Sequence, residues 1–396
     1  MKEIQIKELR GDDIDPILEM AFYAFFSSPG NVEQLIKNKP FFKEDLCYAL
    51  YEDDKVVAGL MLKPIMQNVR GSVKPMCGVA EVVTKPEARR QGYANKLMNL
   101  AFVKMKEKGQ IFSTLYPFKE SFYERLGYIS FPQYRNAIFS PSSLTNLLKE
   151  KYEGTVERVN IKDGLDIYLD FLEDFQKKTH GMGIKHRTEQ DRLKESPNFW
   201  LAFAKNSEGK VIGIMTYRIT GFWKELKVRS FYHENSLAKY LLLQWLANHA
   251  DQVREVHLPV FPNDYPETWN NDTFWGEKGK IMNREWVPSC MGRVVIVNKL
   301  NGLNVGTGHV SIKIIDEQCE WNNTSYSFTS NNGILEVSET SDYDCELTIQ
   351  GFSAIIYGCY NLDDFPFKGW GDISEEIKKT IKFLFPPAYP YLHADF

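Results

Sequence analysis

Two stretches of the sequence repeat one order of expected elements. In each stretch, two apolar strands joined by a polar turn predict a hairpin, and a third strand, a helix and a further strand follow it. The elements are 46–51, 56–62, 76–83, 93–108 and 111–115 in the first stretch, and 200–204, 211–217, 226–231, 236–248 and 256–260 in the second. Strand–helix–strand units of this kind favour an α/β fold, so we expect one α/β domain to be duplicated.

The last third of the chain has a different order, in which strands come first and helices follow. The expected strands are 294–297, 309–315, 325–329, 334–337 and 347–350, and the expected helices are 352–357 and 374–384. This order indicates an α+β domain. We therefore predict an α/β and α+β chain of three domains, with boundaries at 1–145, 146–286 and 287–396.

Composition excludes several classes of protein. The 396 residues carry a net charge of −4, whereas a general nucleic-acid binder needs a basic surface. The longest candidate for a membrane span, Tyr240–Leu246, is far shorter than the roughly 20 residues that a span requires, and the N-terminus lacks an apolar signal core. The six cysteines and seven histidines show no metal-ligand spacing. We expect a cytoplasmic protein without a metal, a nucleic-acid partner or a membrane partner.

The most informative segment is Val79–Leu97, in which an apolar strand runs into a basic turn that opens a helix. The first N–H groups of a helix are unpaired and carry partial positive charge, which suits a phosphate. Gly92 and Ala94 are small enough to let a phosphate approach the backbone, and Arg89 and Arg90 add positive charge. The segment matches neither the P-loop nor the dinucleotide fingerprint. It therefore predicts a different kind of phosphate site.

Arg89-x-x-Gly92-x-Ala94 after an apolar strand resembles the acetyl-coenzyme A signature of the GCN5-related N-acetyltransferases (GNAT). The resemblance implies that the pyrophosphate of acetyl-coenzyme A lies on this turn and that the pantetheine arm pairs with the preceding strand. The implied contacts are Val82, Val83, Thr84, Arg89, Arg90, Gln91, Gly92, Tyr93, Ala94 and Asn95.

The second α/β stretch lacks this turn. At the matching point it reads Phe231–Ala238, with neither arginine nor glycine, and Glu234 would repel a phosphate. We therefore expect the second copy to be structural, or to help shape the substrate site, and not to be a second active site.

The string Phe122–Tyr128, together with the duplicated units, the α+β domain and the terminal phenylalanine, resembles the "enhanced intracellular survival" (Eis) acetyltransferases over the whole chain. That resemblance implies a sterol-carrier-protein fold for the last domain and a hexamer. It also implies that Tyr123 is the general acid, that the terminal carboxylate of Phe396 is the general base, and that Phe118 and Lys119 contact the cofactor.

The acceptor implied by the resemblance is a small cationic amine, similar to a polyamine or an aminoglycoside. Asp395 suits a cation, and the aromatic residues Phe25 and Phe26 are expected to line the acceptor cleft. An α-carboxyl has a pKa of about 3.5 and an alkylamine one of about 10, so direct proton abstraction by Phe396 is unfavourable. The carboxylate would act through water or orient the ammonium. Without the resemblance, the residues alone favour a core position for Tyr123 and a frayed terminus for Phe396.

Two other functions stay open at this point. The last domain could bind an apolar ligand, which would make the chain a lipid-binding protein. Alternatively, the acceptor could be a lysine of a protein, which would require an open groove.

Overall fold

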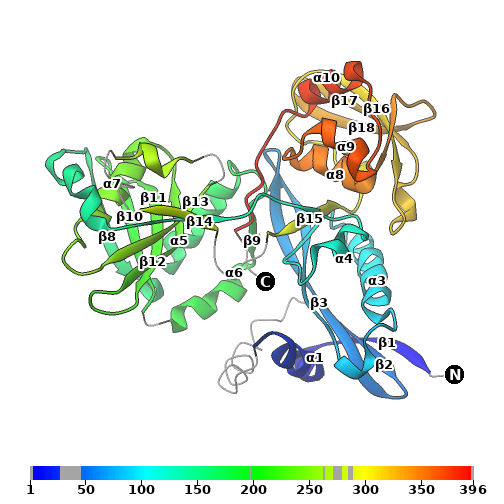
Figure 1. Cartoon of the computed structure of the whole chain (residues 1–396), viewed down its shortest axis with the longest axis horizontal. Coiled ribbons are helices and arrows are strands. Elements are labelled where there is room, and N and C mark those ends of the chain that lie inside the picture. The colour runs from blue at the N-terminus through cyan, green and yellow to red at the C-terminus, as the bar shows by residue number, and fades with distance from the viewer. Residues whose placement is uncertain are drawn as a thin grey trace. The chain divides into compact units, whose positions relative to one another are not determined.

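The computed structural model describes residues 3–26, 46–196, 198–261, 264–270, 279–283 and 289–393, except for the side chains of residues 11, 12, 26 and 283. The chain divides into two compact units. Unit 1 comprises Met1–Phe131, Gln176–Glu189 and Pro288–Phe396, and unit 2 comprises Pro132–Phe175 and Gln190–Val287 (Figure 1).

Unit 1 contains an eight-stranded mixed sheet in the order β1-β2-β3-β4-β5-β15-β6, with β9 paired to β3. The strands are β1 (Ile4–Leu9), β2 (Leu46–Glu52), β3 (Lys55–Val69), β4 (Ser72–Thr84), β5 (Phe112–Leu115), β6 (Ile129–Ser130), β9 (Gly183–Lys185) and β15 (Met291–Val294). β15 was expected at 294–297, within the last domain. It lies earlier and pairs with both β5 and β6, so the last third of the chain completes the first sheet.

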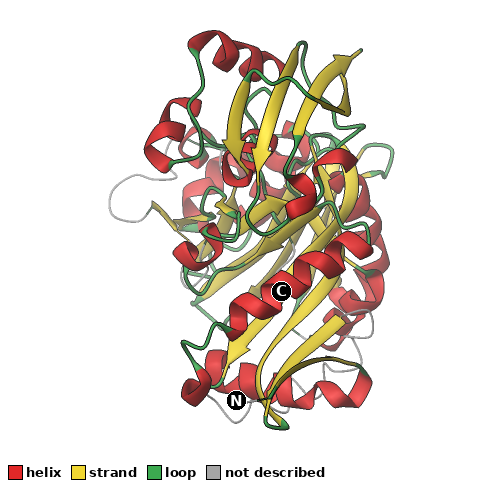
Figure 2. Ribbon diagram, turned by 90° about the vertical axis from the view of Figure 1, so that its right-hand side faces the viewer, coloured by secondary structure: helices red, strands yellow, loops and turns green. Residues whose placement is uncertain are grey.

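Helices cover both faces of this sheet. α3 (Tyr93–Glu107) buries Leu97 and Phe102 in the same apolar cluster as Leu60 and Val79. On the other face, α1 (Asp15–Ala21) buries its apolar residues in a cluster shared with β3 and β4. The shorter segments of this region are η1 (Gly11–Ile14), η2 (Phe22–Phe26), η4 (Pro86–Ala88) and α4 (Glu120–Glu124). Figure 2 shows the helices in red beside the long strands in yellow.

The α+β part of unit 1 has a four-stranded sheet in the order β18-β17-β16-β19. Its elements are β16 (His309–Ile315), β17 (Ser325–Asn331), β18 (Ile334–Thr340), β19 (Cys345–Thr348), α8 (Ile349–Tyr357), α9 (Phe365–Lys368) and α10 (Glu375–Leu384). Three single turns, η9 (Val297–Lys299), η10 (Glu320–Asn322) and η11 (Leu362–Asp364), join them. The predicted order of strands followed by helices is confirmed.

Unit 2 contains a seven-stranded sheet in the order β14-β7-β13-β12-β11-β10-β8. Its strands are β7 (Arg135–Phe139), β8 (Gly154–Asn160), β10 (Trp200–Asn206), β11 (Val211–Ile219), β12 (Glu225–His233), β13 (Glu255–Val260) and β14 (Lys280–Asn283). The helical segments that begin or lie in unit 2 are η5 (Pro141–Lys149), α5 (Ile161–Gln176), η6 (Asp191–Glu195), α7 (Ser236–Ala247) and η7 (Pro266–Thr268), and α6 (Arg187–Gln190) leads back into it. β7 pairs in this sheet although it precedes the expected boundary at residue 145.

Both sheets contain a hairpin followed by a parallel strand pair with a helix between its strands, as the repeated sequence order predicts. The predicted fold class, α/β units with an added α+β part, is confirmed. Within the described residues, no helix has both the length and the apolar character that crossing a bilayer requires.

Candidate active site

The first feature of the site is a strand edge left open where β4 and β5 separate. The two strands pair in parallel from Met76 to Val79 on β4, and β5 ends at Leu115, opposite Val79. β4 continues to Thr84, and within the described residues no strand pairs with its extension on that side. The backbone of Val82–Thr84 is therefore available to an extended ligand with amide groups, which is the role expected for these residues.

The second feature is the turn between β4 and α3. Arg90 and Gly92 both have left-handed backbone angles, with φ values of +63° and +77°. Gly92 is the N-cap of α3, so no side chain caps the first N–H groups of that helix. A Cβ atom placed on Gly92 would meet no other atom within 4 Å. Free helix N–H groups and open space above them form a site that fits a phosphate.

The side chains of the turn point in different directions. Arg89 folds back and donates a hydrogen bond from Nε to the carbonyl oxygen of Thr84 at 3.3 Å. Arg89, Arg90, Gln91, Gly92 and Asn95 are exposed, and Ala94 is half-buried. Tyr93 is buried instead, and its hydroxyl donates to Glu52 Oε2 at 2.5 Å. Tyr93 can therefore contact a phosphate only through its backbone N–H.

Tyr123 lies on α4, the short helix that follows β5. Its side chain is buried, and its ring makes edge contacts with Phe122, at 5.0 Å between ring centroids, and with Tyr128, at 6.0 Å. Burial raises the pKa of its phenol well above the usual value of 10. The phenol is thus held in its protonated form and can act as a proton donor. The neighbouring Phe118 and Lys119 are exposed.

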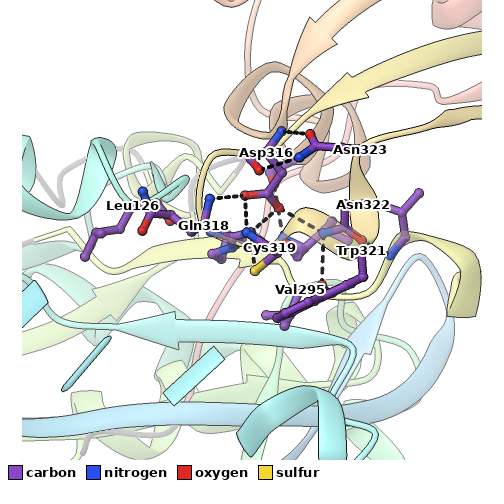
Figure 3. A network of polar contacts seen from close by, with 12 residues as sticks. Leu126, Val295, Asp316, Gln318, Cys319, Trp321, Asn322 and Asn323 are labelled. Atoms are coloured by element: carbon purple, nitrogen blue, oxygen red, sulfur yellow. Dashed lines mark hydrogen bonds and ion pairs between the residues drawn. The ribbon is translucent and has the colours of Figure 1, made fainter. Parts of the chain in front are cut away.

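A buried polar network holds the end of α4. Arg293 of β15 donates from Nη1 to the carbonyl oxygen of Leu126 and from Nη2 to Asp316 Oδ2 at 2.6 Å, and both charged side chains are fully buried. The Asp316 carboxylate also accepts from Asn322 Nδ2 and from the backbone N–H of Cys319 (Figure 3). Removing one partner of a buried ion pair costs about 3–5 kcal/mol. The α+β part therefore fixes the helix that carries Tyr123.

The residues predicted to bind the acceptor are only partly described. Phe25 lies in the π-helical segment η2 and is 48% exposed. The side chain of Phe26, and Asp395 and Phe396, lie outside the described residues. The tail that leads to them packs on unit 1, where the backbone N–H of Tyr391 donates to the carbonyl oxygen of His180 at 2.9 Å.

Two charged residues near the place where β4 and β5 separate are absent from the sequence-based predictions. Glu81 lies in β4 and Lys63 in β3, and Lys63 is 4% exposed. A signal for the first was present, since Glu81 is the one charged residue in the apolar run Val79–Val83.

Comparison with protein families supports this geometry. Residues 5–130 match the acetyltransferase (GNAT) domain, a segment that contains the open strand edge, the basic turn and Tyr123. Residues 297–393 match the sterol carrier protein domain. No curated protein matches the sequence.

Solved structures match over the full length at low sequence identity. A GCN5-related N-acetyltransferase from Anabaena variabilis is 19% identical, with a TM-score of 0.86 and all of both chains covered. One from Kribbella flavida is 18% identical, with a TM-score of 0.81, covering 100% of this chain and 99% of that one. Eis1 from Mycobacterium abscessus is 15% identical, with a TM-score of 0.78, covering 99% and 100%. The chain therefore joins a segment that matches the acetyltransferase (GNAT) domain to one that matches the sterol carrier protein domain, and its fold is that of these three structures.

Proposed function

We propose that this chain transfers an acetyl group from acetyl-coenzyme A to a primary amine of a small cationic acceptor, similar to a polyamine or an aminoglycoside, as an Eis-type enzyme. One observation carries the proposal. The N-terminus of α3, which begins directly after Gly92, has no side-chain cap and lies beside the open edge of β4. Bound acetyl-coenzyme A supplies the acetyl group. The turn holds its pyrophosphate through backbone N–H groups and the side chains of Arg89 and Arg90.

Each remaining residue has one role in this proposal. The backbone of Val82–Thr84 pairs with the pantetheine arm, and Phe118 and Lys119 flank it. Tyr123, which burial keeps protonated, gives a proton to the departing thiolate. The carboxylate of Phe396 orients the acceptor or takes its proton.

The acceptor side and the assembly are also part of this proposal. Asp395 attracts the cationic acceptor, and Phe25 and Phe26 line its cleft. The enzyme works in the cytoplasm, as its composition favours, and forms a hexamer, as the resemblance to the Eis family implies.

A thiol-release assay tests the proposal. The full-length enzyme is mixed with acetyl-coenzyme A and a panel of polyamines, aminoglycosides and lysine-containing peptides. We expect free thiol with at least one small polyamine or aminoglycoside, and acetylated product by mass spectrometry. Thiol release with the peptides alone would make the protein a lysine acetyltransferase. If none of the amines in the panel caused thiol release, the proposal would be contradicted.

The role of the terminal carboxylate is tested by deleting Phe396 and by amidating the terminus. We expect turnover to fall about 100-fold, the usual contribution of a positioned acid or base, with acetyl-coenzyme A affinity unchanged. Calorimetric titration with the donor gives the affinity, and the thiol assay gives turnover. Full activity of the amidated enzyme would remove the carboxylate from the mechanism.

A second candidate function is binding of an apolar ligand, which the match of residues 297–393 to the sterol carrier protein domain favours. Against it, the basic turn has kept Arg89, Arg90 and Gly92, which a lipid carrier does not need. Mass spectrometry of organic extracts from the purified protein decides the matter, since a carrier would co-purify with a stoichiometric lipid.

A further inference from the structure

The tail, residues 386–393, is held against the rest of unit 1 by backbone hydrogen bonds. The N–H of Ala388 donates to the carbonyl oxygen of Gly358 at 3.0 Å. The N–H of Tyr391 donates to the carbonyl oxygen of His180 at 2.9 Å. A Cβ atom placed on Gly358 would lie 2.7 Å from the backbone nitrogen of Ala388, so only glycine allows this close approach.

A buried guanidinium group joins the tail to the end of α8. Arg70 lies in the two-residue turn between β3 and β4, and its side chain is buried. Its Nε donates to the carbonyl oxygen of Ile356 at 2.7 Å, and its Nη2 donates to that of Ile355 at 2.8 Å. Its Nη1 donates to the carbonyl oxygen of Pro386, in the tail, at 3.0 Å. Because burying a charge is costly, packing alone would favour an apolar residue here.

The ring of His180 links the same turn to α8. Its Nδ1 accepts a hydrogen bond from the backbone N–H of Arg70 at 2.9 Å, so the ring proton is on Nε2. That nitrogen donates to the carbonyl oxygen of Tyr357 at 2.9 Å. Burial lowers the pKa of His180 to about 4, which keeps the ring neutral at pH 7. Arg70 and His180 together therefore bind the last carbonyl groups of α8, where donors are otherwise lacking.

The other end of α8 contacts the helix that carries Tyr123. Gln350, in the first turn of α8, donates from Nε2 to the carbonyl oxygen of Glu124, the last residue of α4, at 2.9 Å. In the middle of α8, Ser353 Oγ accepts a hydrogen bond from the N–H of Val294 in β15 at 3.0 Å. One helix thus contacts both the segment that carries Tyr123 and the tail.

The tail leads toward the place where β4 leaves β5. A Cβ atom placed on Gly183 would lie 2.9 Å from Leu392 Cδ1 and 3.1 Å from Met76 Cε, so Leu392 lies close to Met76. Met76 begins the parallel pairing of β4 with β5 and Val79 ends it, about 10 Å farther along the strand. The residues from Leu392 to Phe396 can span up to about 14 Å. The carboxylate of Phe396 is therefore within reach of the open strand edge.

We propose that Arg70 and His180 are positioning residues, which hold the tail so that the carboxylate of Phe396 meets the acceptor amine. The inference rests on the proposed function, in which that carboxylate orients the amine or takes its proton. One planar guanidinium group binds both α8 and Pro386, so it fixes the tail relative to the helix that also contacts α4. A tail released from Arg70 would bring the carboxylate to the amine less often, while the turn that binds the donor would be unaltered.

Kinetics of Arg70→Met test the proposal with the best amine from the thiol-release panel. Methionine is long and unbranched but donates no hydrogen bond, so we expect kcat to fall about 100-fold, as in the enzyme without Phe396, with acetyl-coenzyme A affinity unchanged. Arg70→Lys keeps a charge at the end of α8 but has one nitrogen in place of three, so it should keep the wild-type thermal midpoint and lose about tenfold in kcat. Lys74→Met is the matched control. It removes a 2.8 Å hydrogen bond from the same hairpin to the carbonyl oxygen of Asn301, which is not in the tail, and should behave as the wild type.

A double-mutant cycle separates positioning from a general loss of structure. If Arg70 acts through the terminal carboxylate, Arg70→Met should reduce turnover no further in an enzyme that already lacks Phe396. His180→Phe keeps an aromatic ring and loses both ring hydrogen bonds, so it should give the same pattern. Losses that multiply in either double variant would overturn the role of that residue.

Hydrogen exchange gives a second readout, which does not depend on turnover. The amides of Ala388 and Tyr391 donate hydrogen bonds and should exchange slowly in the wild type. In Arg70→Met and Arg70→Lys we expect the peptide of residues 385–396 to exchange at least tenfold faster, and in Lys74→Met at the wild-type rate. Wild-type exchange in both Arg70 variants would overturn the inference. If no amine yields thiol with the wild type, the proposed function fails, and the exchange rates alone decide whether Arg70 holds the tail.

Discussion

The two copies of the α/β unit differ most at the turn that enters their helices. In the first copy, residues 85–92 separate β4 from α3, whereas Glu234 and Asn235 alone separate β12 from α7. The first turn leaves its helix uncapped at Gly92. In the second, Asn235 Oδ1 accepts a hydrogen bond from the N–H of Ala238 at 2.9 Å and closes the helix end.

The open strand edge, by contrast, is common to both copies in the part of the chain that the structure describes. β12 pairs in parallel with β13 up to Lys227 opposite His257 and then continues to His233, as β4 continues past Val79. The fold thus provides a diverging strand pair twice, while the residues at the helix entry leave the N-terminus without a side-chain cap in the first copy and not in the second. Topology alone does not identify an active site in this architecture.

The largest expected effect comes from reversing a charge on the first turn. Arg90→Glu should weaken acetyl-coenzyme A binding at least 100-fold, about 3 kcal/mol, because a charge-assisted hydrogen bond is replaced by repulsion. Arg90 is exposed, so the thermal midpoint should not change. Calorimetric titration with the donor measures the affinity.

The matched control is Glu234→Lys, which adds a positive charge at the second turn. It should leave both the affinity and the stoichiometry of one donor per chain unchanged, because α7 stays capped. Binding of a second donor molecule by Glu234→Lys would show that charge alone makes the two copies differ in donor binding. An unaltered donor affinity in Arg90→Glu would refute the assignment of the first turn as the pyrophosphate site.

The sequence predicted those parts of the fold that local patterns specify. The helix at 93–108 was correct to within a residue, since its apolar positions repeat at helical spacing and a glycine follows it. The place of β15 could not be predicted in this way, because its pairing joins Val294 to Phe112, far apart in the chain. The buried ion pair of Arg293, within that strand, could likewise not be predicted, since the partners of Arg293 come from distant segments of the chain.

The site shows the same division. The basic turn was predictable because its residues are adjacent in the sequence and match a known motif. The left-handed φ of +50° at Glu81, in an irregularity of the β3–β4 pairing, was not predictable, because such an angle is normally a property of glycine and nothing in the local sequence of β4 indicates one there. The roles of Asp395 and Phe396 stay predictions, since those residues are outside the described part of the chain.

The second-largest effect concerns His233, the residue that comes just before the second turn. Burial lowers the pKa of His233, the last residue of β12, to about 4. The unfolded state, with a histidine pKa of about 6.5, therefore binds the extra proton, so the stability from neutral His233 is present above pH 6.5 and is lost as the pH falls toward 4. At pH 5 the loss is about 2 kcal/mol.

Urea unfolding of the full chain at pH 7 and pH 5 measures this loss. His233→Phe keeps an aromatic ring and has no site to protonate, so its free energy of unfolding should fall by about 2 kcal/mol less between the two pH values. Other histidines titrate equally in both proteins. If the free energy of unfolding had the same pH dependence in both proteins, water would have to reach His233 beside the second turn. The entries to the two helices would then be more alike in their exposure to solvent.

The smallest effects are the sharpest test of the comparison, because matched substitutions at the two helix N-caps should have different consequences. Gly92→Ala places a Cβ on a residue with φ of +77°, and Asn235→Ala removes a capping oxygen, so each should cost about 1 kcal/mol of stability. In Gly92→Ala the new methyl group also lies in the open space above α3 and should weaken donor binding about tenfold, or about 1.4 kcal/mol. Asn235→Ala should leave the affinity unaltered. Urea unfolding and calorimetric titration on the same protein samples measure both quantities, and equal donor affinity in the two variants would mean that the N-terminus of α3 is not where the pyrophosphate binds.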